Sequence, residues 1–493
     1  MICTRNSLAA ELVMALALAL AGCSGIGGGA GDSAPNPEIA GLLEEAQALM
    51  VDGALADAGR KLDEARGLAP DDPDLWVAIA KLRYRGGEHF TALEAADRAL
   101  ALGPDHAPAL VMRALLVRDA HGFSAALPWF EAALAADPGN REVWAEYAAT
   151  LGDNGAGSNT LKAVAKLAEA APDDPRIPFY QAVVAARAGD LPLARSLLAR
   201  SGMVTRGVPA AMMLDAVISL KQGNPGGASE ILEQLAARQP GNVRARELLA
   251  KALLQSGRED EVIARFAAEV TKPEASPYLV AVVARAYERS GDRAKAAPLL
   301  ARAYGGTDGA LAVLSSRTGL PEPTAELRSL AGAGNWAGAS ANAAALRDRF
   351  PQSADVASLA GDARLGAGEP AAALETYALA VKVKRPWPLT RRAVLAYRQA
   401  GDELAADTLL ARHVSGEPNM PSALFALAER QAEQGEWGRT ALLLDHAMAL
   451  GGAHDPALLT LRLRAARALD DAGDVRRFAA MLAEVRPLLL TRP

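Results

Sequence analysis

The chain has 493 residues, of which 22% are charged and 51% are hydrophobic, and its formal net charge is −6. This apolar share argues against a wholly disordered chain, and the acidic balance argues against a general nucleic-acid binder, which needs basic residues to displace phosphate counterions. Aromatic residues amount to only 4% and alanine carries much of the apolar share, which favours closely packed helices over a β-sandwich.

The first residues have the features of a targeting segment. Arg5 supplies a positive charge, and residues 12–22 form an uncharged run. This run is too short to span a bilayer as a helix but has the length of a signal-peptide core. The letters LAGC at 20–23 resemble the lipobox of bacterial lipoproteins.

The lipobox resemblance implies that residues 1–22 are a lipoprotein signal peptide and that Cys23 becomes the lipidated, palmitate-bearing first residue of the mature chain. Cys3 then leaves with the signal, and no disulfide is possible in the mature protein. Residues 23–37 are rich in Gly, Ser, Ala and Pro and predict a flexible tether. Glu11 departs from the usual signal pattern, and an ordinary secretory signal with a chance cysteine remains the alternative.

Beyond the tether, an alanine recurs every 34 residues. This first series comprises Ala46, Ala80, Ala114, Ala148, Ala182, Ala216, Ala250 and Ala284. A second series, twelve residues later, comprises Ala58, Ala92, Ala126, Ala194, Ala228 and Ala296, with Thr160 and Val262 in its two gaps. A third series, after another twelve residues, comprises Pro70, Pro104, Pro138, Pro172 and Pro240. Uninterrupted periodicity of this length predicts a repeat architecture.

The pattern is similar to that of the tetratricopeptide repeat, in which each unit is a pair of antiparallel helices. Small residues are needed where the two helix axes come closest, and larger ones such as Trp76, Trp144, Phe130 and Phe266 fill the space between turns. The proline ends the second helix of a unit. Gly-Asp pairs are expected between the two helices, at Gly189-Asp190, Gly291-Asp292, Gly401-Asp402 and Gly473-Asp474.

This resemblance covers nearly the whole mature chain. We expect an all-α, right-handed α-solenoid of about thirteen repeats, with repeats 1–8 in strict register over residues 38–304. An insertion at 305–320 interrupts the register, and degenerate repeats 9–13 follow over 321–487. In such a linear array each repeat is expected to contact only its neighbours.

No catalytic motif accompanies the repeats. The sequence has no Walker A loop and no GxSxG, HExxH or CxxC motif, so we expect no enzyme activity, no metal site and no cofactor. Asp445-His446 comes nearest to an acid–base pair, but adjacent residues of a helix point in different directions. An enzyme, or the targeting half of one, remains the least favoured interpretation.

A solenoid of this family binds through its groove, which the first helix of each repeat lines. Aligning the repeats places an apolar strip and three polar neighbours on that surface. The predicted partner-binding residues are Phe179, Val183, Met213, Val217, Leu220, Lys251, Tyr278 and Arg285.

The same positions nearer the carboxyl end carry arginines, beside the basic stretch KVKRPWPLTRR at 382–392. They suggest an alternative function, direct binding of an anionic polysaccharide. The candidate residues are Arg391, Arg398, Phe425 and Arg467.

The favoured interpretation is a lipid-anchored scaffold of the bacterial cell envelope that recruits proteins through its groove. The chain resembles repeat-bearing lipoproteins that assist exopolysaccharide export or envelope assembly, and its length favours the export group. By the same resemblance, Ser24 after the cysteine favours the outer membrane, facing the periplasm, over the inner membrane. The expected partners are envelope proteins, an anionic polysaccharide in the alternative, and the membrane through the lipid anchor, but no nucleic acid.

Overall fold

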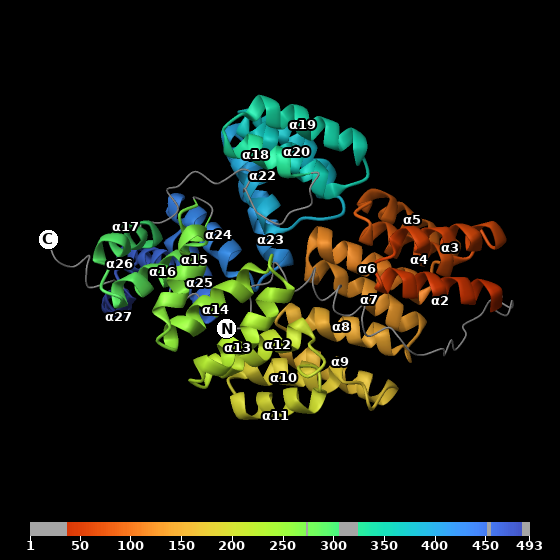
Figure 1. The fold of residues 1–493 in the computed structure, drawn as a ribbon, viewed down its shortest axis with the longest axis horizontal. Coiled ribbons are helices and arrows are strands. Elements are labelled where there is room, and N and C mark those ends of the chain that lie inside the picture. Colours follow the sequence, from red (N-terminus) through yellow and green to blue (C-terminus); the bar gives the residue numbers. More distant parts are fainter. Residues whose placement is uncertain (1–36, 273–274, 305–323, 451–454, 486–493) are drawn as a thin grey trace. The chain divides into compact units, whose positions relative to one another are not determined.

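The computed structural model describes residues 37–272, 275–304, 324–450 and 455–485. Over these residues the chain forms 26 α-helices and no strand, and consecutive helices pair into thirteen helix-turn-helix units (Figure 1). The predicted all-α solenoid of about thirteen repeats is therefore confirmed. The predicted signal peptide, Cys23 and the predicted insertion at 305–320 lie outside the described residues.

We number the helix pairs as repeats 1 to 13. Repeats 1 to 8 are α2 (Pro37–Val51) with α3 (Leu55–Leu68), α4 (Pro73–Arg85) with α5 (His89–Leu102), α6 (Ala107–His121) with α7 (Phe123–Ala136), α8 (Arg141–Asp153) with α9 (Gly157–Ala170), α10 (Arg176–Ala188) with α11 (Leu191–Ser201), α12 (Pro209–Lys221) with α13 (Pro225–Arg238), α14 (Val243–Gln255) with α15 (Glu259–Val270), and α16 (Pro277–Arg289) with α17 (Arg293–Tyr304).

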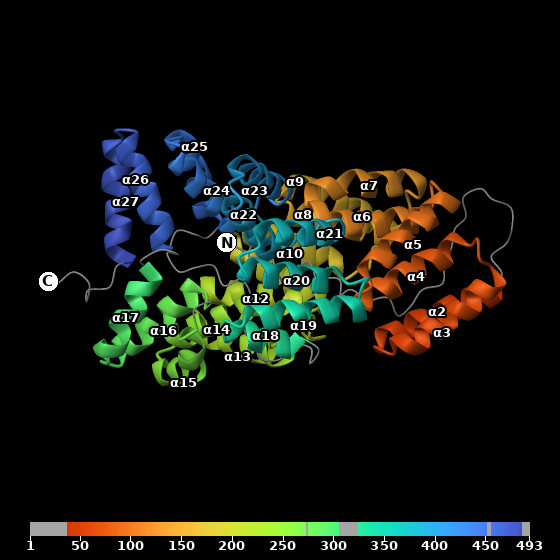
Figure 2. The same ribbon diagram turned by 90° about the horizontal axis from the view of Figure 1, so that it is seen from above.

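Five further pairs follow the insertion. Repeats 9 to 13 are α18 (Ala325–Gly332) with α19 (Trp336–Arg349), α20 (Ala354–Gly366) with α21 (Pro370–Ala380), α22 (Trp387–Gln399) with α23 (Glu403–Gly416), α24 (Pro421–Glu433) with α25 (Trp437–Ala449), and α26 (Pro456–Ala468) with α27 (Ala472–Val485). Figure 2 shows α26 and α27 side by side as one such pair.

The two periodic series explain why the helices pair. The eight alanines of the first series lie on the first helix of repeats 1 to 8, and all eight are fully buried. The second series lies on the second helix of the same repeats, and its six alanines are also fully buried, as is Val262, while Thr160 is buried. A methyl group at these positions lets the two helix axes approach closely, as the sequence predicts.

Two tryptophans link successive repeats. Trp76 Nε1 donates to the carbonyl oxygen of Pro70 at 2.7 Å, and Trp144 Nε1 donates to that of Pro138 at 2.8 Å. The ring faces pack against buried clusters, in repeat 3 beside the fully buried Phe130. A partly buried indole needs a partner for its N–H, and here the proline that ends one repeat supplies it. The predicted packing role of these residues is confirmed.

Glycine and aspartate make the turns inside the repeats. Gly189 has a φ of +87°, a left-handed conformation that side chains rarely adopt. The Asp190 carboxylate then accepts a hydrogen bond from Leu193 N at 3.1 Å and caps α11. Asp292 and Asp402 cap their helices in the same way.

The turn of repeat 13 differs from the prediction. Helix α27 already begins at Ala472, so Gly473 lies inside its first turn and does not break the helices. The left-handed residue is Asp470, with a φ of +55°, and Asp471 caps the helix by accepting from Asp474 N at 2.9 Å. Aspartate can take both roles because its short side chain tolerates the left-handed region and bonds to nearby backbone.

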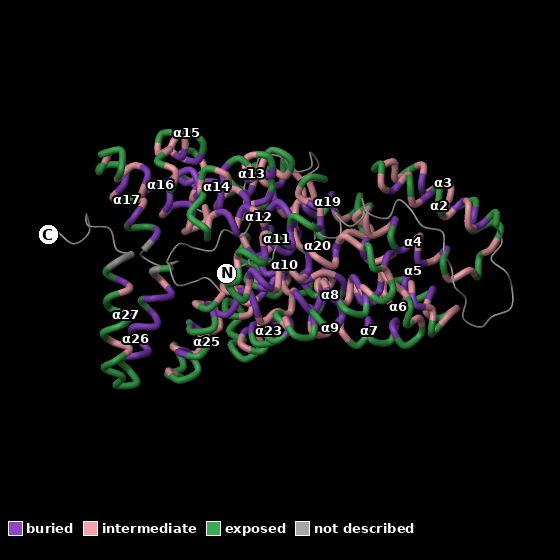
Figure 3. The backbone as a smooth tube through the Cα atoms, turned by 90° about the horizontal axis from the view of Figure 1, so that it is seen from below, coloured by how far each residue is buried: buried purple, intermediate pink, exposed green. Residues whose placement is uncertain are grey.

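The described residues divide into two compact units. The first unit comprises 37–180 and 324–417, and the second unit comprises 181–304 and 418–485. Within each unit, buried and exposed stretches alternate along the helices (Figure 3). This alternation is the pattern of amphipathic helices that pack on one side.

Within the first unit, the expectation that repeats contact only their neighbours is wrong. Arg385 N, just before repeat 11, donates to Asp119 O of repeat 3 at 2.8 Å. Ala354 N at the start of repeat 10 donates to Nδ1 of the buried His89 in repeat 2 at 3.2 Å. These bonds satisfy backbone N–H groups at helix starts, where no partner exists within the helix.

A pair of glycines allows a backbone approach in the same region. Gly122 ends α6 with a φ of +92°, and a Cβ there would lie 2.6 Å from the carbonyl carbon and oxygen of Gly416 at the end of α23. Helices α7 and α23 are in contact. Only two residues without side chains can bring these backbones so close.

Candidate partner-binding face

Of the predicted partner-binding residues, all but Phe179 and Val183 lie on the first helices of repeats 6 to 8, in the second unit. Val217 and Leu220 on α12 and Tyr278 on α16 are partly exposed and rest on one buried cluster, which spans α12 to α16. Lys251 on α14 and Arg285 on α16 are partly exposed as well. We call these five residues the α12–α16 face.

Three other predicted residues contribute less surface. Met213 is only 7% exposed and belongs to the buried cluster beneath the α12–α16 face. Phe179 is 5% exposed and stacks on Tyr180 in the first unit, with ring centroids 5.7 Å apart. Val183 on α10 is partly exposed, in the second unit. The partner-binding role of the whole set stays a prediction, and its accessible members are those on the α12–α16 face together with Val183.

Tyr278 is held by residues that the sequence did not single out. The Arg244 guanidinium lies 5.8 Å from the centre of the Tyr278 ring and donates to Glu247 Oε2 at 3.3 Å. Glu247 also accepts a hydrogen bond from the Ser276 hydroxyl. Burial raises the pKa of Tyr278 to about 12, so the phenol stays neutral at physiological pH.

Arg244, Glu247 and Lys251 share one side of α14, because spacings of three and four residues return to the same side of a helix. Once Lys251 is chosen as a candidate, this helical spacing is the sequence pattern that identifies Arg244 and Glu247 as its neighbours. Burial and, after it, the positive charge of Arg244 lower the pKa of Lys251. Lys251 forms no ion pair with any residue in the described ranges, whereas Arg285 Nη1 pairs with Glu288 Oε2 at 2.7 Å.

Asp445 and His446 have different partners. Asp445 accepts from Arg462 Nε at 2.8 Å, and His446 Nε2 lies 2.9 Å from the carbonyl oxygen of Pro418. The expectation that they point apart is confirmed, and they do not form an acid–base pair. Across the described part of the chain, no group of three His, Cys, Asp or Glu residues has the arrangement to hold a metal ion.

Models of the tetratricopeptide repeat family match residues 77–141, 219–268 and 324–388. These segments are tetratricopeptide repeats. They include helices of repeats 2, 3, 6, 7, 9 and 10, so both the regular and the degenerate parts of the array carry the family's pattern. Together they cover just over a third of the chain, and over these segments the chain is similar to the tetratricopeptide repeat family, whose members bind other proteins.

Three solved structures illustrate the likeness. Pseudomonas aeruginosa PilF has 16% identity and a TM-score of 0.35 over 44% of this chain and 98% of its own. Yeast Tom70 has 13% identity and a TM-score of 0.32 over 91% of this chain and 99% of its own. YrrB, described as having an unusual peptide-binding site, has 23% identity and a TM-score of 0.28 over 37% and 95%. A comparison with curated protein sequences found no match. Likeness at these identities concerns the fold and not the function.

The residues proposed for an anionic polymer lie on repeats 11, 12 and 13. Arg391 and Arg398 are exposed on α22 in the first unit, and Arg398 Nε pairs with Glu403 Oε2 at 3.5 Å. Phe425 is partly exposed on α24, and Arg467 is exposed on α26, both in the second unit. The four candidate residues are therefore divided between the two units.

A polar pocket of about 470 Å³ lies at the turns of repeats 7 and 8. Its lining includes Arg258, Glu261 and Arg289. Arg258 Nη2 donates to Glu261 Oε2 at 2.7 Å, and Arg289 Nη1 donates to Leu254 O at 2.8 Å. Because these charged side chains already have partners within the protein, they give no indication that the pocket binds a ligand. Among the described helices, none combines the length and the apolar character needed to cross a membrane.

Proposed function

We propose that this tetratricopeptide repeat protein is a lipid-anchored scaffold of the bacterial cell envelope, which binds a partner protein on the α12–α16 face. The observation that carries the proposal is the combination of partly exposed Val217, Leu220 and Tyr278 over one buried cluster with a partly exposed cation, Lys251, on α14 of the intervening repeat. Apolar surface backed by a rigid core and bordered by charge is typical of a protein-binding site.

The face suits an amphipathic segment laid across three consecutive repeats. Val217 and Leu220 are spaced by three residues on α12, and Tyr278 presents an aromatic ring on α16. They would contact the apolar side of the partner, and Lys251 would meet a carboxylate that fixes its register. The lowered pKa of Lys251 supports this role, because a partner's carboxylate would restore the favourable environment that burial removes.

The location rests on the amino-terminal sequence. The lipobox-like segment ending at Cys23 and the tether at 23–37 support attachment to a membrane by lipid, with Ser24 favouring the outer membrane and the periplasmic side. A single acyl chain binds membranes only marginally, whereas the several chains of a lipoprotein hold stably. Exopolysaccharide export or envelope assembly is the process that we propose such a scaffold serves.

Site-specific photocrosslinking in intact cells tests the binding face. A photoreactive residue at Val217 or Leu220 should yield the same discrete protein adduct, and Lys251→Glu in the same chain should remove it. The matched control is Leu442, an apolar residue 72% exposed on α25 of the same unit, which should yield no such adduct. Equal adducts from Leu442 would show that the face does not select a partner.

Fatty-acid labelling tests the anchor separately. The wild-type chain should take up the label, and Cys23→Ser should remain an unlabelled precursor or soluble product. Equal labelling of both chains would remove the lipoprotein part of the proposal and leave the binding face unaffected.

A further inference from the structure

Arg385 is a buried arginine whose Nε–H is unsatisfied. It precedes α22 in the first unit and is only 6% exposed. Its backbone N–H donates to Asp119 O at 2.8 Å, which fixes its position against repeat 3. Its Nε is buried without a hydrogen-bond partner, and its side chain makes no ion pair within the described ranges. A buried guanidinium that forms no ion pair is destabilising in itself.

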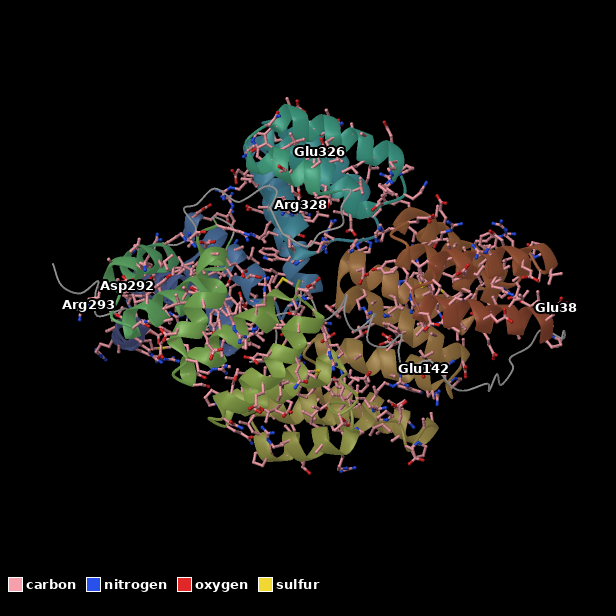
Figure 4. All side chains as sticks on the ribbon, in the orientation of Figure 1. Glu38, Glu142, Asp292, Arg293, Glu326 and Arg328 are labelled. Carbon is pink, nitrogen blue, oxygen red and sulfur yellow. The ribbon has the colours of Figure 1, made fainter. Side chains whose placement is uncertain are left out.

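Other buried arginines of the same unit are paired. Arg118 is also 6% exposed, and its Nη1 donates to Glu146 Oε2 at 3.2 Å and to Thr150 Oγ1 at 3.3 Å. Arg176 donates to both carboxylate oxygens of Glu142, at 2.6 and 2.9 Å; Glu142 is labelled in Figure 4. The lack of a carboxylate partner is therefore a property of the Arg385 site and not of buried arginines in this fold.

The surroundings of Arg385 are also positively charged. Burial and then Arg385 lower the pKa of His121 at the end of α6, and Arg113 and Arg412 lower it further. Glu417 is the acidic residue that favours the charged form of Arg385, and Arg412 opposes it. An anion that entered here would meet a net positive potential.

His413 adds a neutral polar group beside Arg385. It is buried on α23, its Nδ1 lies 3.0 Å from Thr390 Oγ1, and its Nε2 has no hydrogen-bond partner. Burial, together with Arg385, lowers the pKa of His413 to about 3, so the ring is neutral at physiological pH. The Trp387 ring, 5.1 Å from the His413 ring, holds it in place. When the Thr390 hydroxyl donates to Nδ1, Nε2 carries a proton that it can give to a ligand.

The site exists because the backbone is brought together there. Gly122 and Gly416 allow the end of α6 to meet the end of α23, and this contact places His121 beside the segment that carries Arg385 and His413. No single repeat contains the site, which distinguishes it from the α12–α16 face of the second unit.

We propose that Arg385, with His413 and His121 beside it, binds one carboxylate of an acidic peptide segment. The proposal rests on the proposed function, because it gives the protein partner an acidic segment for the first unit. A carboxylate fits the guanidinium, since it can accept two parallel N–H bonds. The side chain of glutamate reaches a recessed cation on two methylene groups, whereas the carboxylate of a uronate is attached directly to a bulky sugar ring.

Fluorescence anisotropy with a labelled hepta-glutamate peptide tests the site in the full chain, with hepta-glutamine as the neutral control. The wild type should bind hepta-glutamate, and Arg385→Met should weaken binding at least tenfold. Arg398→Met removes the same charge from the exposed side of α22 and should change binding less than twofold. Leu442→Asp, on α25 and outside both proposed sites, should bind hepta-glutamate as the wild type does. Photocrosslinking at Val217 and Leu220 tests the α12–α16 face by itself, so failure of one proposal is separate from failure of the other.

Thermal unfolding supplies the second measurement. Arg385→Met should raise the unfolding midpoint, because it removes an uncompensated buried charge, whereas Arg118→Met should lower it by leaving Glu146 unpaired. The proposal is overturned if Arg385→Met lowers the midpoint as Arg118→Met does, or if Arg398→Met weakens binding equally. It is also overturned if an oligouronate binds in an Arg385-dependent manner and hepta-glutamate does not.

Discussion

Repeats 7 and 10 pack their two helices against each other with different residues. In each, a small residue on the first helix stands sixteen positions before an aromatic one on the second: Ala250 and Phe266 in repeat 7, Gly361 and Tyr377 in repeat 10. Ala250, Phe266 and Tyr377 are buried, and a Cβ at Gly361 would overlap the Tyr377 ring. A phenyl ring therefore leaves room for a methyl group, and the tyrosine ring does not.

The hydroxyl of Tyr377 explains the difference. It donates to Oδ1 of the buried Asp362 at 2.7 Å, and Arg392 Nε lies 3.5 Å from the same oxygen. This hydrogen bond holds the Tyr377 ring against α20, directly over Gly361. Only glycine fits there, because a side chain would overlap the ring. In repeat 10 a polar contact has thus replaced part of the apolar packing, and the residue beside Asp362 has changed to glycine with it.

The largest expected effect is the pH dependence caused by Asp362. Burial raises its pKa from 3.8 to about 7, so the folded chain keeps a proton there that the unfolded chain loses. Its contribution to stability is therefore full below pH 4 and is lost as the pH rises to 7, on the order of 4 kcal/mol in total. Chemical denaturation from pH 4 to 7 should show this decline in the wild type relative to Asp362→Asn. Parallel curves for the two chains would show that Asp362 is ionised throughout.

A smaller effect is expected from Gly361→Ala. The new methyl group must displace the Tyr377 ring, which should lower the free energy of unfolding by about 2 kcal/mol. The control is Gly41→Ala on α2, where no atom lies within 4 Å of the added Cβ. That change should stabilise the chain by up to about 1 kcal/mol, because alanine favours helix. The same sign for both variants in denaturant titrations would contradict the packing explanation.

The smallest effect is expected from the reverse change in repeat 7. Ala250→Gly should cost about 1 kcal/mol, the helix preference of alanine over glycine, with a small addition for the lost methyl packing. Denaturant titration against the wild type measures it. A loss several times larger would mean that Phe266 depends on the methyl group as closely as Tyr377 depends on its absence.

The binding residues were only partly predictable. Val217 and Leu220 follow from helical spacing, and both are partly exposed as expected. Met213 lies on the same helix but is buried, because helix α12 is apolar on more than one side and its sequence alone does not tell which side faces its neighbours. Arg385 was visible only as one cation in a basic stretch, and its burial depends on a contact with repeat 3.

The sequence by itself determined the helix pairs, the turns inside most of them and the small residues between them. Such contacts join residues at a constant separation along the chain, so they recur as periods of 34 residues that can be counted. Only the tertiary structure decided the contacts of repeats 2 and 3 with repeats 10 and 11, including a bond between residues 265 positions apart. A contact that occurs once leaves no period in the sequence. The close approach of Gly122 to Gly416 and the burial of Arg385 therefore become recognisable only in the folded chain, where repeats 3 and 11 meet.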